Sequence, residues 1–434
     1  MPSRETAQSC ARYFASLTEA RLFNGAALVA RAGDVVFEGA AGDADHERRI
    51  PSRTDTTYRI GSVTKPITAT AIFSLSETGA ISIAAPISRY LPQCPASWSA
   101  ITVAHLLSHA SGIPSYTRLA GYPAFMRTAA SPSETLKRVE HLPLAFPPGT
   151  RSAYSNSGYL LLGMIIEHVT AVPYATWLQR GIFGPAGMGS SGCGEPVAGL
   201  RMAVGYTCDG EKIAPACEPH SSIAFSAGSC YSRVEDLWRF AAALFGGSLL
   251  RPDSVACMTM PVHAAYASGW FVGQQQGHRM IWHNGGIGGF SSHLAYFPAE
   301  QVTVVVLSNH ATGDADAVAR GLASITLGEP WALPRRREPI AVAPELIEQY
   351  VGTYRFPGGQ TVSVTLSQGR LCLQSEGQEA FPGLATSRNE FFLPALDAEF
   401  SFDVGERGEV RLTLRQAADT FVADKTEPSD DYLP

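Results

Sequence analysis

The stretch Arg59-Ile-Gly-Ser-Val-Thr-Lys-Pro66 places a serine, Ser62, three positions before a lysine, Lys65. An apolar pattern follows, so we expect the pair at the start of a helix, where positions three apart share a face. A serine becomes a nucleophile when a neighbouring base takes its proton, and a lysine whose pKa is lowered by burial can be that base. The pair alone also fits a solvated helix start with a serine cap and a surface lysine.

Two later segments carry further polar groups. Pro147-Pro-Gly-Thr-Arg-Ser-Ala-Tyr-Ser-Asn156 ends in a Tyr-x-Asn, and its prolines and glycine predict a loop. Alternation along a loop or short strand would aim Tyr154 and Asn156 the same way. The run Ile281-Trp-His-Asn-Gly-Gly286 joins two strand-like segments. Its glycines allow a substrate to lie close against a strand edge.

Ser-x-x-Lys, Tyr-x-Asn and His-x-Gly, in this order, resemble the motifs of one family. Its members are class C β-lactamases, D-alanyl-D-alanine carboxypeptidases, D-aminopeptidases, β-lactamase-fold esterases and penicillin-binding-protein-type thioesterases. Supporting runs, such as Leu106-Leu-Ser-His-Ala-Ser-Gly-Ile-Pro114, extend the resemblance from about Phe23 to Leu327. The resemblance implies an α/β (α+β) β-lactamase-like fold, in which helices flank an antiparallel sheet and an all-helical subdomain is added.

The resemblance also implies roles for the first two motifs. Ser62 attacks a carbonyl and becomes acylated, and Lys65 takes its proton. Tyr154 shares the base role or passes the proton to the leaving group. Asn156 orients Lys65 and hydrogen-bonds the acyl part of the substrate, although a turn residue would look the same.

The third motif completes the site that the resemblance implies. His283 holds a substrate carboxylate or carbonyl, or supports Tyr154, unless it is a structural histidine at a strand end. Asn284 binds substrate with it, and the backbone N–H groups of Ser62 and Gly286 form the oxyanion hole. Many β-lactamases have Lys-Thr-Gly here. A histidine is largely neutral near pH 7, so strong β-lactamase activity is not expected.

Competing motifs are incomplete, so neither a metal nor a cofactor is predicted. His105 and His109 have helical spacing, but the glutamate of a zinc peptidase does not follow His105. Gly285-Gly-Ile-Gly-Gly289 does not match a dinucleotide-binding loop. A Gly-x-Ser-x-Gly elbow, as in α/β-hydrolases, is not present either.

Composition limits the partners and the compartment. The net charge of −6 and the lack of a long basic run exclude nucleic acid as an expected partner. The first residues do not resemble a signal peptide, and no apolar run predicts a membrane span. Eight cysteines without a Cys-x-x-Cys pair favour reduced thiols in a cytoplasmic protein. A disulfide among Cys193, Cys208, Cys217 and Cys230 is the second choice.

Two domains are expected. A helix at 6–22 and strands at 25–31 and 34–39 precede a mostly helical stretch from 62 to about 244. Strands follow at 268–273, 278–283, 292–297 and 302–307, with a closing helix at 313–327, so one antiparallel sheet is built from both ends of domain 1–329. A proline-rich linker, 330–343, contains Arg335-Arg-Arg337. Evenly spaced short strands in 344–434 predict a small antiparallel barrel, which resembles the lipocalin-like domain of the family.

These expectations combine into a metal-free serine hydrolase or acyltransferase. Its substrates are small-molecule or peptide amides or esters, first among them D-amino-acid peptides and simple esters. Release or cyclisation of a carrier-bound peptide is the second choice. A non-catalytic ligand-binding protein of the same fold is the rival from another class. Specificity is expected to lie in 110–145 and 185–225, and the sequence does not indicate the oligomeric state.

Overall fold

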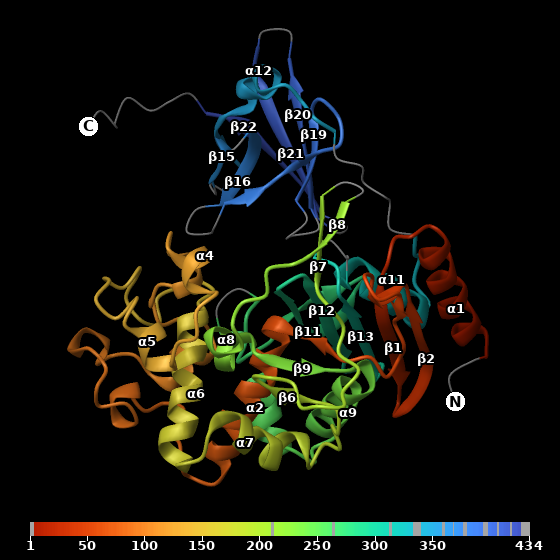
Figure 1. The fold of residues 1–434 in the computed structure, drawn as a ribbon. Helices are drawn as coiled ribbons and strands as arrows, with labels where there is room; N and C mark the ends of the chain where they lie inside the picture. The colour runs from red at the N-terminus through yellow and green to blue at the C-terminus, as the bar shows by residue number, and fades with distance from the viewer. Residues whose placement is uncertain are drawn as a thin grey trace. The chain divides into compact units, whose positions relative to one another are not determined.

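The computed structural model describes residues 4–209, 212–262, 265–311, 315–332, 340–357, 361–367, 369–375, 380–393, 398–405, 408–416 and 419–426, and every structural statement below concerns these residues. The chain divides into two compact units, residues 1–334 and 335–434 (Figure 1). Half of the predicted linker, including Arg335-Arg-Arg337, lies outside the described residues.

An antiparallel sheet of six strands forms the centre of the first unit, in the order β10-β11-β12-β13-β1-β2. The strands are β1 (Gly25–Arg31), β2 (Asp34–Ala41), β10 (Phe271–Gln275), β11 (His278–Ile287), β12 (Phe290–Phe297) and β13 (Val302–Ser308). β1 pairs with β13 from Gly25 opposite Ser308 to Arg31 opposite Val302. The prediction of one sheet built from both ends of the unit is therefore confirmed.

Alternation along the strands gives the sheet two buried faces. In β1, Ala27 and Val29 belong to the core beneath helices α1 (Arg4–Glu19) and α11 (Ala315–Leu327). Ala26 and Leu28 belong to the larger core on the helical side. Figure 1 shows α1 and α11 on the side of the sheet away from the helical region. Because both faces are covered, the first six residues of β1 are all buried.

Most helices lie between residues 59 and 271 of the chain. The α-helices of the first unit are α1 (Arg4–Glu19), α2 (Thr64–Glu77), α3 (Val103–Leu107), α4 (Tyr122–Phe125), α5 (Pro132–Leu136), α6 (Asn156–Thr170), α7 (Tyr174–Leu178), α8 (Ser221–Gly228), α9 (Val234–Phe245), α10 (Pro252–Met258) and α11 (Ala315–Leu327). Short turns of other helix types are η1 (Gly61–Val63), η2 (Ile87–Arg89), η3 (Ala96–Trp98), η4 (Tyr116–Arg118) and η5 (Gln179–Phe183).

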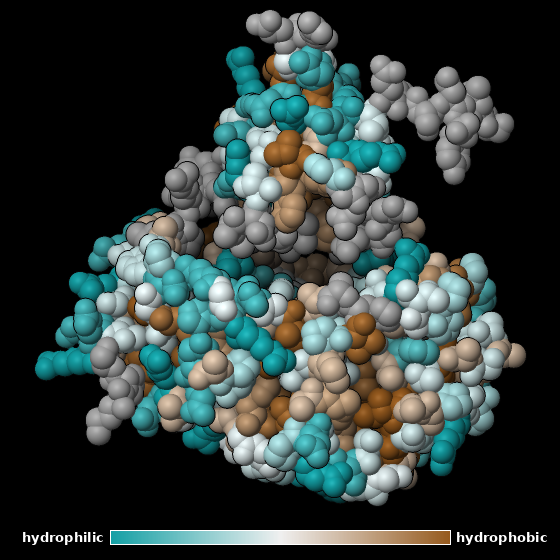
Figure 2. Space-filling model, turned by 180° about the vertical axis from the view of Figure 1, so that it is seen from behind, coloured by the Kyte–Doolittle hydropathy of each residue, from teal (hydrophilic) through white to brown (hydrophobic). Residues whose placement is uncertain are grey.

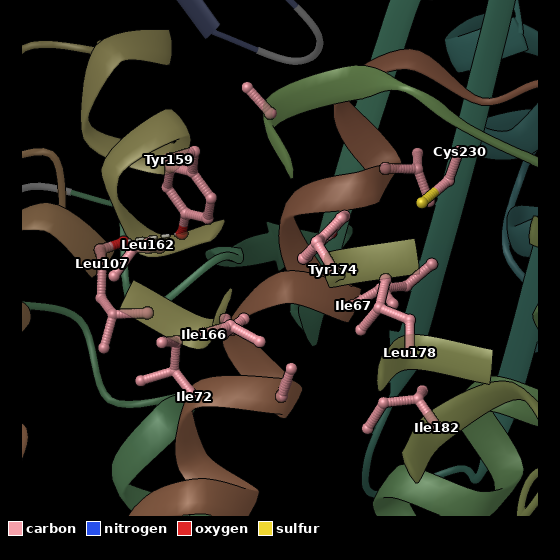
Figure 3. Packing of buried hydrophobic residues seen from close by; sticks show 14 of the residues in the cluster. Ile67, Ile72, Leu107, Tyr159, Leu162, Ile166, Tyr174, Leu178, Ile182 and Cys230 are labelled. Carbon is pink, nitrogen blue, oxygen red and sulfur yellow. Dashed lines mark hydrogen bonds between the residues drawn. The ribbon is translucent and has the colours of Figure 1, made fainter. Parts of the chain in front are cut away.

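Helix α2 is buried on all sides from Thr64 to Phe73 and lies inside the larger core. Figure 3 shows its Ile67 and Ile72 packed among side chains of α6 and α7. Taken singly, none of the described helices is long and apolar enough to cross a membrane. α6 and the segment Tyr174–Phe183 meet that criterion only as a pair, bent by 77°.

The helical region also contains short strands that the sequence does not predict. They are β3 (Asp43–Asp45) with β4 (Ile50–Pro51), β5 (Tyr58–Arg59) with β9 (Cys230–Ser232) and β6 (Gly192–Cys193), and β7 (Tyr206–Asp209) with β8 (Lys212–Pro215). Strands of two to four residues are too short to show a period in the sequence.

The prediction of reduced thiols is wrong for Cys193 and Cys230, which form a disulfide. The two residues lie directly opposite each other in the β6–β9 pair, although 37 positions separate them in the chain. That pairing is a tertiary property, which cysteine spacing does not reveal. Described free cysteines are Cys10, Cys94, Cys217, Cys257 and Cys372. The cytoplasmic location, which relied partly on reduced thiols, stays a prediction.

The second unit contains α12 (Pro344–Ile347), η6 (Glu348–Tyr350) and a nine-stranded antiparallel sheet in the order β17-β16-β15-β14-β22-β21-β20-β19-β18. Its strands are β14 (Gly352–Arg355), β15 (Thr361–Ser367), β16 (Arg370–Ser375), β17 (Phe381–Pro382), β18 (Leu384–Ala385), β19 (Glu390–Leu393), β20 (Ala398–Val404), β21 (Val410–Gln416) and β22 (Asp419–Lys425).

The two end strands of this sheet, β17 and β18, are separated by Gly383 alone. Consecutive strands cannot occupy opposite edges of a flat sheet, so the sheet curls until its two end strands lie next to each other. The predicted small barrel is confirmed. Its interior is aromatic, with the rings of Tyr350 and Phe402 stacked at 4.2 Å between centroids and Phe391 and Phe400 beside them.

Exposed apolar side chains of the first unit include Val35, Val197, Met260 and Val262. On the face that Figure 2 shows, hydrophobic and hydrophilic residues are interspersed. Singly exposed apolar side chains are normal in folded proteins and carry no functional conclusion.

Candidate active site

Ser62 and Lys65 lie where the chain passes from β5 into α2. Ser62 belongs to the 3₁₀ turn η1, ahead of the predicted helix, and Lys65 belongs to the first turn of α2. Lys65 Nζ lies 3.1 Å from Ser62 Oγ. The two side chains are adjacent across the change of helix type, so the predicted proximity is observed.

Lys65 is completely buried, which is rare for a lysine. Its Nζ donates hydrogen bonds to the side-chain oxygen of Asn156 and to the carbonyl oxygen of Ala227, each at 2.8 Å. Burial holds the pKa of Lys65 well below its usual value, because the charged form loses its hydration.

Tyr154 and Asn156 both reach Lys65, although Asn156 is the first residue of α6 rather than part of a strand. The ring centroid of Tyr154 lies 4.7 Å from Lys65 Nζ. Two hydrogen bonds fix the orientation of Asn156. Its backbone N–H donates to Ser115 Oγ at 3.1 Å, and its side-chain N–H donates to Thr117 Oγ1 at 3.1 Å. Its oxygen is thereby aimed at Lys65.

His109 also belongs to this site, although the sequence indicated only its helical spacing from His105. Its backbone carbonyl accepts the N–H of Ala153 at 3.0 Å, and its Nδ1 accepts the N–H of Ser155 at 3.2 Å. Its ring centroid lies 4.3 Å from that of Tyr154. His109 therefore positions Tyr154 in two ways. It hydrogen-bonds to the residues before and after Tyr154, and its ring lies against the Tyr154 ring.

Two features of His109, its backbone conformation and a buried ring nitrogen, are energetically unfavourable. Its φ of 57° is in the left-handed region, which few residues other than glycine occupy. Its Nε2 is buried and has no hydrogen-bond partner among the described residues. Burial, followed by the charge of Lys65, holds the pKa of His109 well below its ordinary value. A neutral ring with Nδ1 as acceptor carries its proton on Nε2. In the sequence, the run Leu106-Leu-Ser-His-Ala-Ser-Gly112, which is part of the family resemblance, was the feature that could have indicated His109 as a site residue.

The edge of β11 faces the nucleophile. Pairing between β10 and β11 ends at Phe271 opposite Trp282, so β10 does not cover residues 283–287. The turn η1 packs there instead. A Cβ atom on Gly61 would lie 2.9 Å from the nitrogen of Gly286, and one on Gly285 would lie 2.8 Å from the nitrogen of Ser62. Only glycine allows this approach of the two backbones.

His283 is buried in the same region, and both of its ring nitrogens are occupied. Nδ1 lies 2.6 Å from the carbonyl oxygen of Asn284, and Nε2 lies 3.2 Å from the hydroxyl of Tyr266. Burial, followed by the charge of Lys65, lowers the pKa of His283 to about 3. The ring is therefore neutral at ordinary pH and donates through Nδ1, which leaves Nε2 to accept from Tyr266.

Asn284, predicted to bind substrate, points to the opposite face of the sheet. Its side-chain N–H donates to Asp316 in α11 at 2.9 Å, and Asp316 also lies 2.6 Å from Nδ1 of His293. Neighbouring residues of a strand point to opposite faces, so Asn284 cannot share the side of His283. The structure thus brings together Ser62, Lys65, Tyr154, Asn156, His283 and Gly286, but not the side chain of Asn284.

A protein-family model described as "Beta-lactamase" matches residues 11–326. The chain belongs to the β-lactamase family. A second model, described as a domain of unknown function (DUF3471), matches residues 336–428, which form the barrel.

Relatives of this β-lactamase-family chain carry several names. It is 28% identical over 420 residues to "Penicillin-binding protein 4*" of Bacillus subtilis (strain 168), covering 91% of this chain and 93% of the relative. It is 34% identical over 207 residues to "Esterase EstB" of Burkholderia gladioli, covering 44% of this chain and 52% of that relative.

Solved structures show the same fold. The octameric penicillin-binding protein homologue from Pyrococcus abyssi matches with a TM-score of 0.68 and 23% identity, over 96% of this chain and 99% of that one. A D-stereospecific amidohydrolase from Streptomyces sp. matches with a TM-score of 0.62 and 25% identity, over 74% of this chain and 99% of that one. The first unit is therefore a β-lactamase-fold domain of a serine hydrolase family with esterase and amidase members.

Proposed function

We propose that this protein hydrolyses small esters and amides, including those with a D-configured acyl residue, through an acyl-enzyme formed on Ser62. The observation that carries the proposal is the environment of Lys65 Nζ. This buried nitrogen contacts Ser62 Oγ, the Asn156 side-chain oxygen and the Ala227 carbonyl oxygen and no other described polar partner.

These three contacts match the hydrogen-bond donors and the acceptor of a neutral lysine amine. A neutral amine has two N–H groups and one lone pair. The oxygens of Asn156 and Ala227 can only accept, so they take both N–H groups. The lone pair then faces the hydroxyl of Ser62 at 3.1 Å and takes its proton during attack.

The charge that develops on the substrate carbonyl oxygen needs donors that are fixed before the reaction. We assign this role to the backbone N–H groups of Ser62 and Gly286, which the glycines at 61 and 285 bring together. Such donors typically contribute about 3 kcal/mol each to an acyl-transfer barrier. The Tyr154 phenol, next to Lys65, relays the proton to the leaving group.

The neutral state of His283 supports the choice of substrates. Its pKa of about 3 leaves no positive charge at this position near neutral pH. A β-lactam carboxylate would therefore find no fixed cation in His283, whereas an uncharged ester or primary amide needs none. The relatives named as an esterase and a D-stereospecific amidohydrolase support the same substrate classes.

Intact-protein mass spectrometry tests the proposal. The protein is mixed briefly with p-nitrophenyl acetate, D-phenylalanine amide or benzylpenicillin. We expect a mass increase of one acyl group with the ester, and turnover of the ester and the amide that exceeds turnover of the penicillin. Ser62→Ala should abolish both signals, whereas Ser74→Ala, the same change later in α2, should keep them. Acylation that persists in Ser62→Ala would refute the nucleophile.

Other sequence-based expectations stay predictions. They are a cytoplasmic location, a small-molecule or peptide substrate, and no nucleic acid or membrane partner. Addition of an amine to the acylated protein would separate hydrolysis from the alternative, in which a carrier-bound peptide is released or cyclised.

A further inference from the structure

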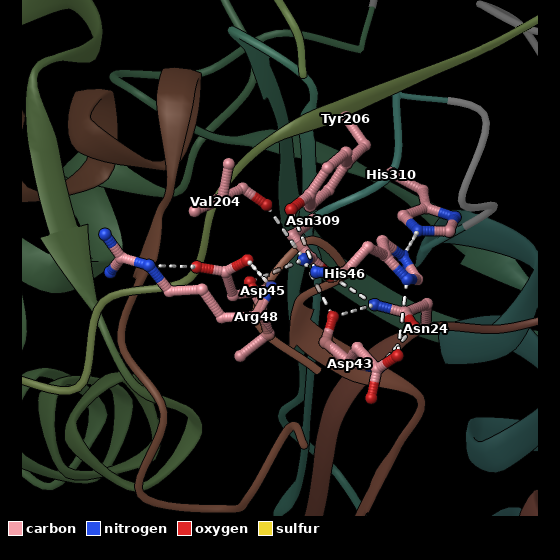
Figure 4. Close-up of polar contacts among 10 residues, drawn as sticks. Asn24, Asp43, Asp45, His46, Arg48, Val204, Tyr206, Asn309 and His310 are labelled. Carbon is pink, nitrogen blue, oxygen red and sulfur yellow. Dashed lines mark hydrogen bonds and ion pairs between the residues drawn. The ribbon is translucent and has the colours of Figure 1, made fainter. Parts of the chain in front are cut away.

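Two histidines outside the Ser62 site point their Nε2 atoms at each other. His46 follows β3 and His310 follows β13, and the two Nε2 atoms lie 2.8 Å apart (Figure 4). The residues are 264 positions apart in the chain, so only the fold brings them together.

The backbone around this pair is fixed by a polar network. The backbone N–H of His46 donates to the hydroxyl of Tyr206 at 2.9 Å, and the Tyr206 ring packs against the His46 ring at 4.7 Å between centroids. Asn309, next to His310, donates through its side chain to the carbonyl oxygens of Asp43, Ala44 and Val204. Figure 4 shows His46 and His310 at one side of this network. Tyr206 thus holds the backbone and the ring of His46, and the hydrogen bonds of Asn309 hold the chain next to His310.

The outer nitrogen of His46 has a carboxylate partner. Asp43 Oδ2 lies 3.4 Å from His46 Nδ1. A carboxylate on one ring nitrogen favours the proton there and leaves the lone pair on the other nitrogen, an arrangement that recurs behind metal-binding histidines.

We propose that His46 and His310 bind a divalent transition-metal ion such as Zn²⁺ through their Nε2 atoms. An ion about 2.0–2.1 Å from each nitrogen in tetrahedral geometry requires the nitrogens to lie about 3.3 Å apart. The rings need to separate by about half an ångström to admit it. His46 keeps 25% of its side-chain surface exposed, so the ion and its waters can reach the pair.

The site differs from a closed structural metal centre. In the described ranges, no group of three or more His, Cys, Asp or Glu side chains is placed to hold a metal. Of the described residues, His46 and His310 are the two proposed ligands, and water can fill the remaining coordination positions. We expect binding that is weaker than in a four-ligand zinc site, and that ties the segment after β3 to the end of β13.

Calorimetric titration with ZnCl₂ tests the site. The full chain is used without a histidine tag and after treatment with a chelator. Cys217→Ser and Cys257→Ser remove the exposed thiols, because thiolates are themselves zinc ligands. We expect one Zn²⁺ per chain and a raised thermal midpoint. His310→Ala should abolish both effects. Asp43→Asn, which leaves the two ligands in place, should weaken binding about tenfold.

A matched control removes a histidine elsewhere. His141 is exposed on the surface, and His141→Ala should leave the titration unchanged. Circular dichroism and acylation of Ser62 report whether each variant is folded. No binding of Zn²⁺ to the folded parent, or equal binding by the parent and a folded His310→Ala, would overturn the proposal. The pair would then be an ordinary hydrogen bond between two imidazoles.

Discussion

The pKa of Lys65 decides how the activity depends on pH. A general base works in its neutral form, so activity rises as pH rises through the pKa of the base. Burial lowers the pKa of Lys65, which moves this rise well below pH 10.5. Asn156→Asp places a carboxylate 2.8 Å from Nζ, stabilises the charged lysine and should move the rise to higher pH.

The measurement is kcat/KM against pH for the parent and for Asn156→Asp. Lys65→Arg, whose side chain stays charged, should lose about a hundredfold or more in activity and show no such rise. An unchanged profile in Asn156→Asp would mean that Lys65 is not the base.

His109 should act by positioning Tyr154. His109→Ala removes the acceptor for Ser155 N–H and the ring against Tyr154, so we expect kcat to fall by up to about a hundredfold with little change in KM. His109→Asn keeps an acceptor near the position of Nδ1 and tolerates positive φ, so it should retain more activity than alanine. Equal losses in both variants would contradict positioning through the Ser155 hydrogen bond.

At the scale of elements, the site depends on the contact between η1 and the edge of β11. A Cβ atom on Gly285 would lie 2.2 Å from the carbonyl oxygen of Ile60 and 2.8 Å from the nitrogen of Ser62. Gly285→Ala must push these elements apart, and the misplaced N–H groups should cost about a hundredfold or more in kcat.

Gly273→Ala is the matched control for this prediction, because Gly273 lies in β10 of the same sheet. A Cβ there would meet no described atom within 4 Å. We expect near-parental kinetics and stability from this variant. Comparable activity in both alanine variants would show that the approach of η1 to β11 does not matter for catalysis.

At the scale of the whole molecule, each unit has its own core. Leu161 is buried in the large core of the first unit, and Phe402 is buried in the aromatic core of the barrel. Replacing either residue by alanine should cost about 2–5 kcal/mol in the unit that contains it. Calorimetry should therefore show two thermal transitions, with Leu161→Ala lowering one and Phe402→Ala lowering the other. One transition that both variants lower equally would contradict independent units.

Local patterns in the sequence determined much of this architecture. Runs of alternating or apolar residues located the strands of the central sheet, and β1 has the bounds that were predicted from the sequence. The spacing of Ser62 and Lys65 determined that their side chains meet, since three positions make about one helical turn in either helix type. The motif order was enough to indicate the family before any fold was known.

Other features depended on residues far apart in the chain. The Cys193–Cys230 disulfide, the His46–His310 pair and the reach of Lys65 to Asn156 join segments separated by 37, 264 and 91 positions. Asn284 was misplaced because sequence proximity to His283 does not reveal which face of a strand lies toward the site. Composition and spacing report neighbours along the chain, whereas burial, strand pairing and pKa depend on neighbours in space. The sequence therefore determined the chemistry available to this protein, and tertiary packing decided which groups share a site and in which protonation state.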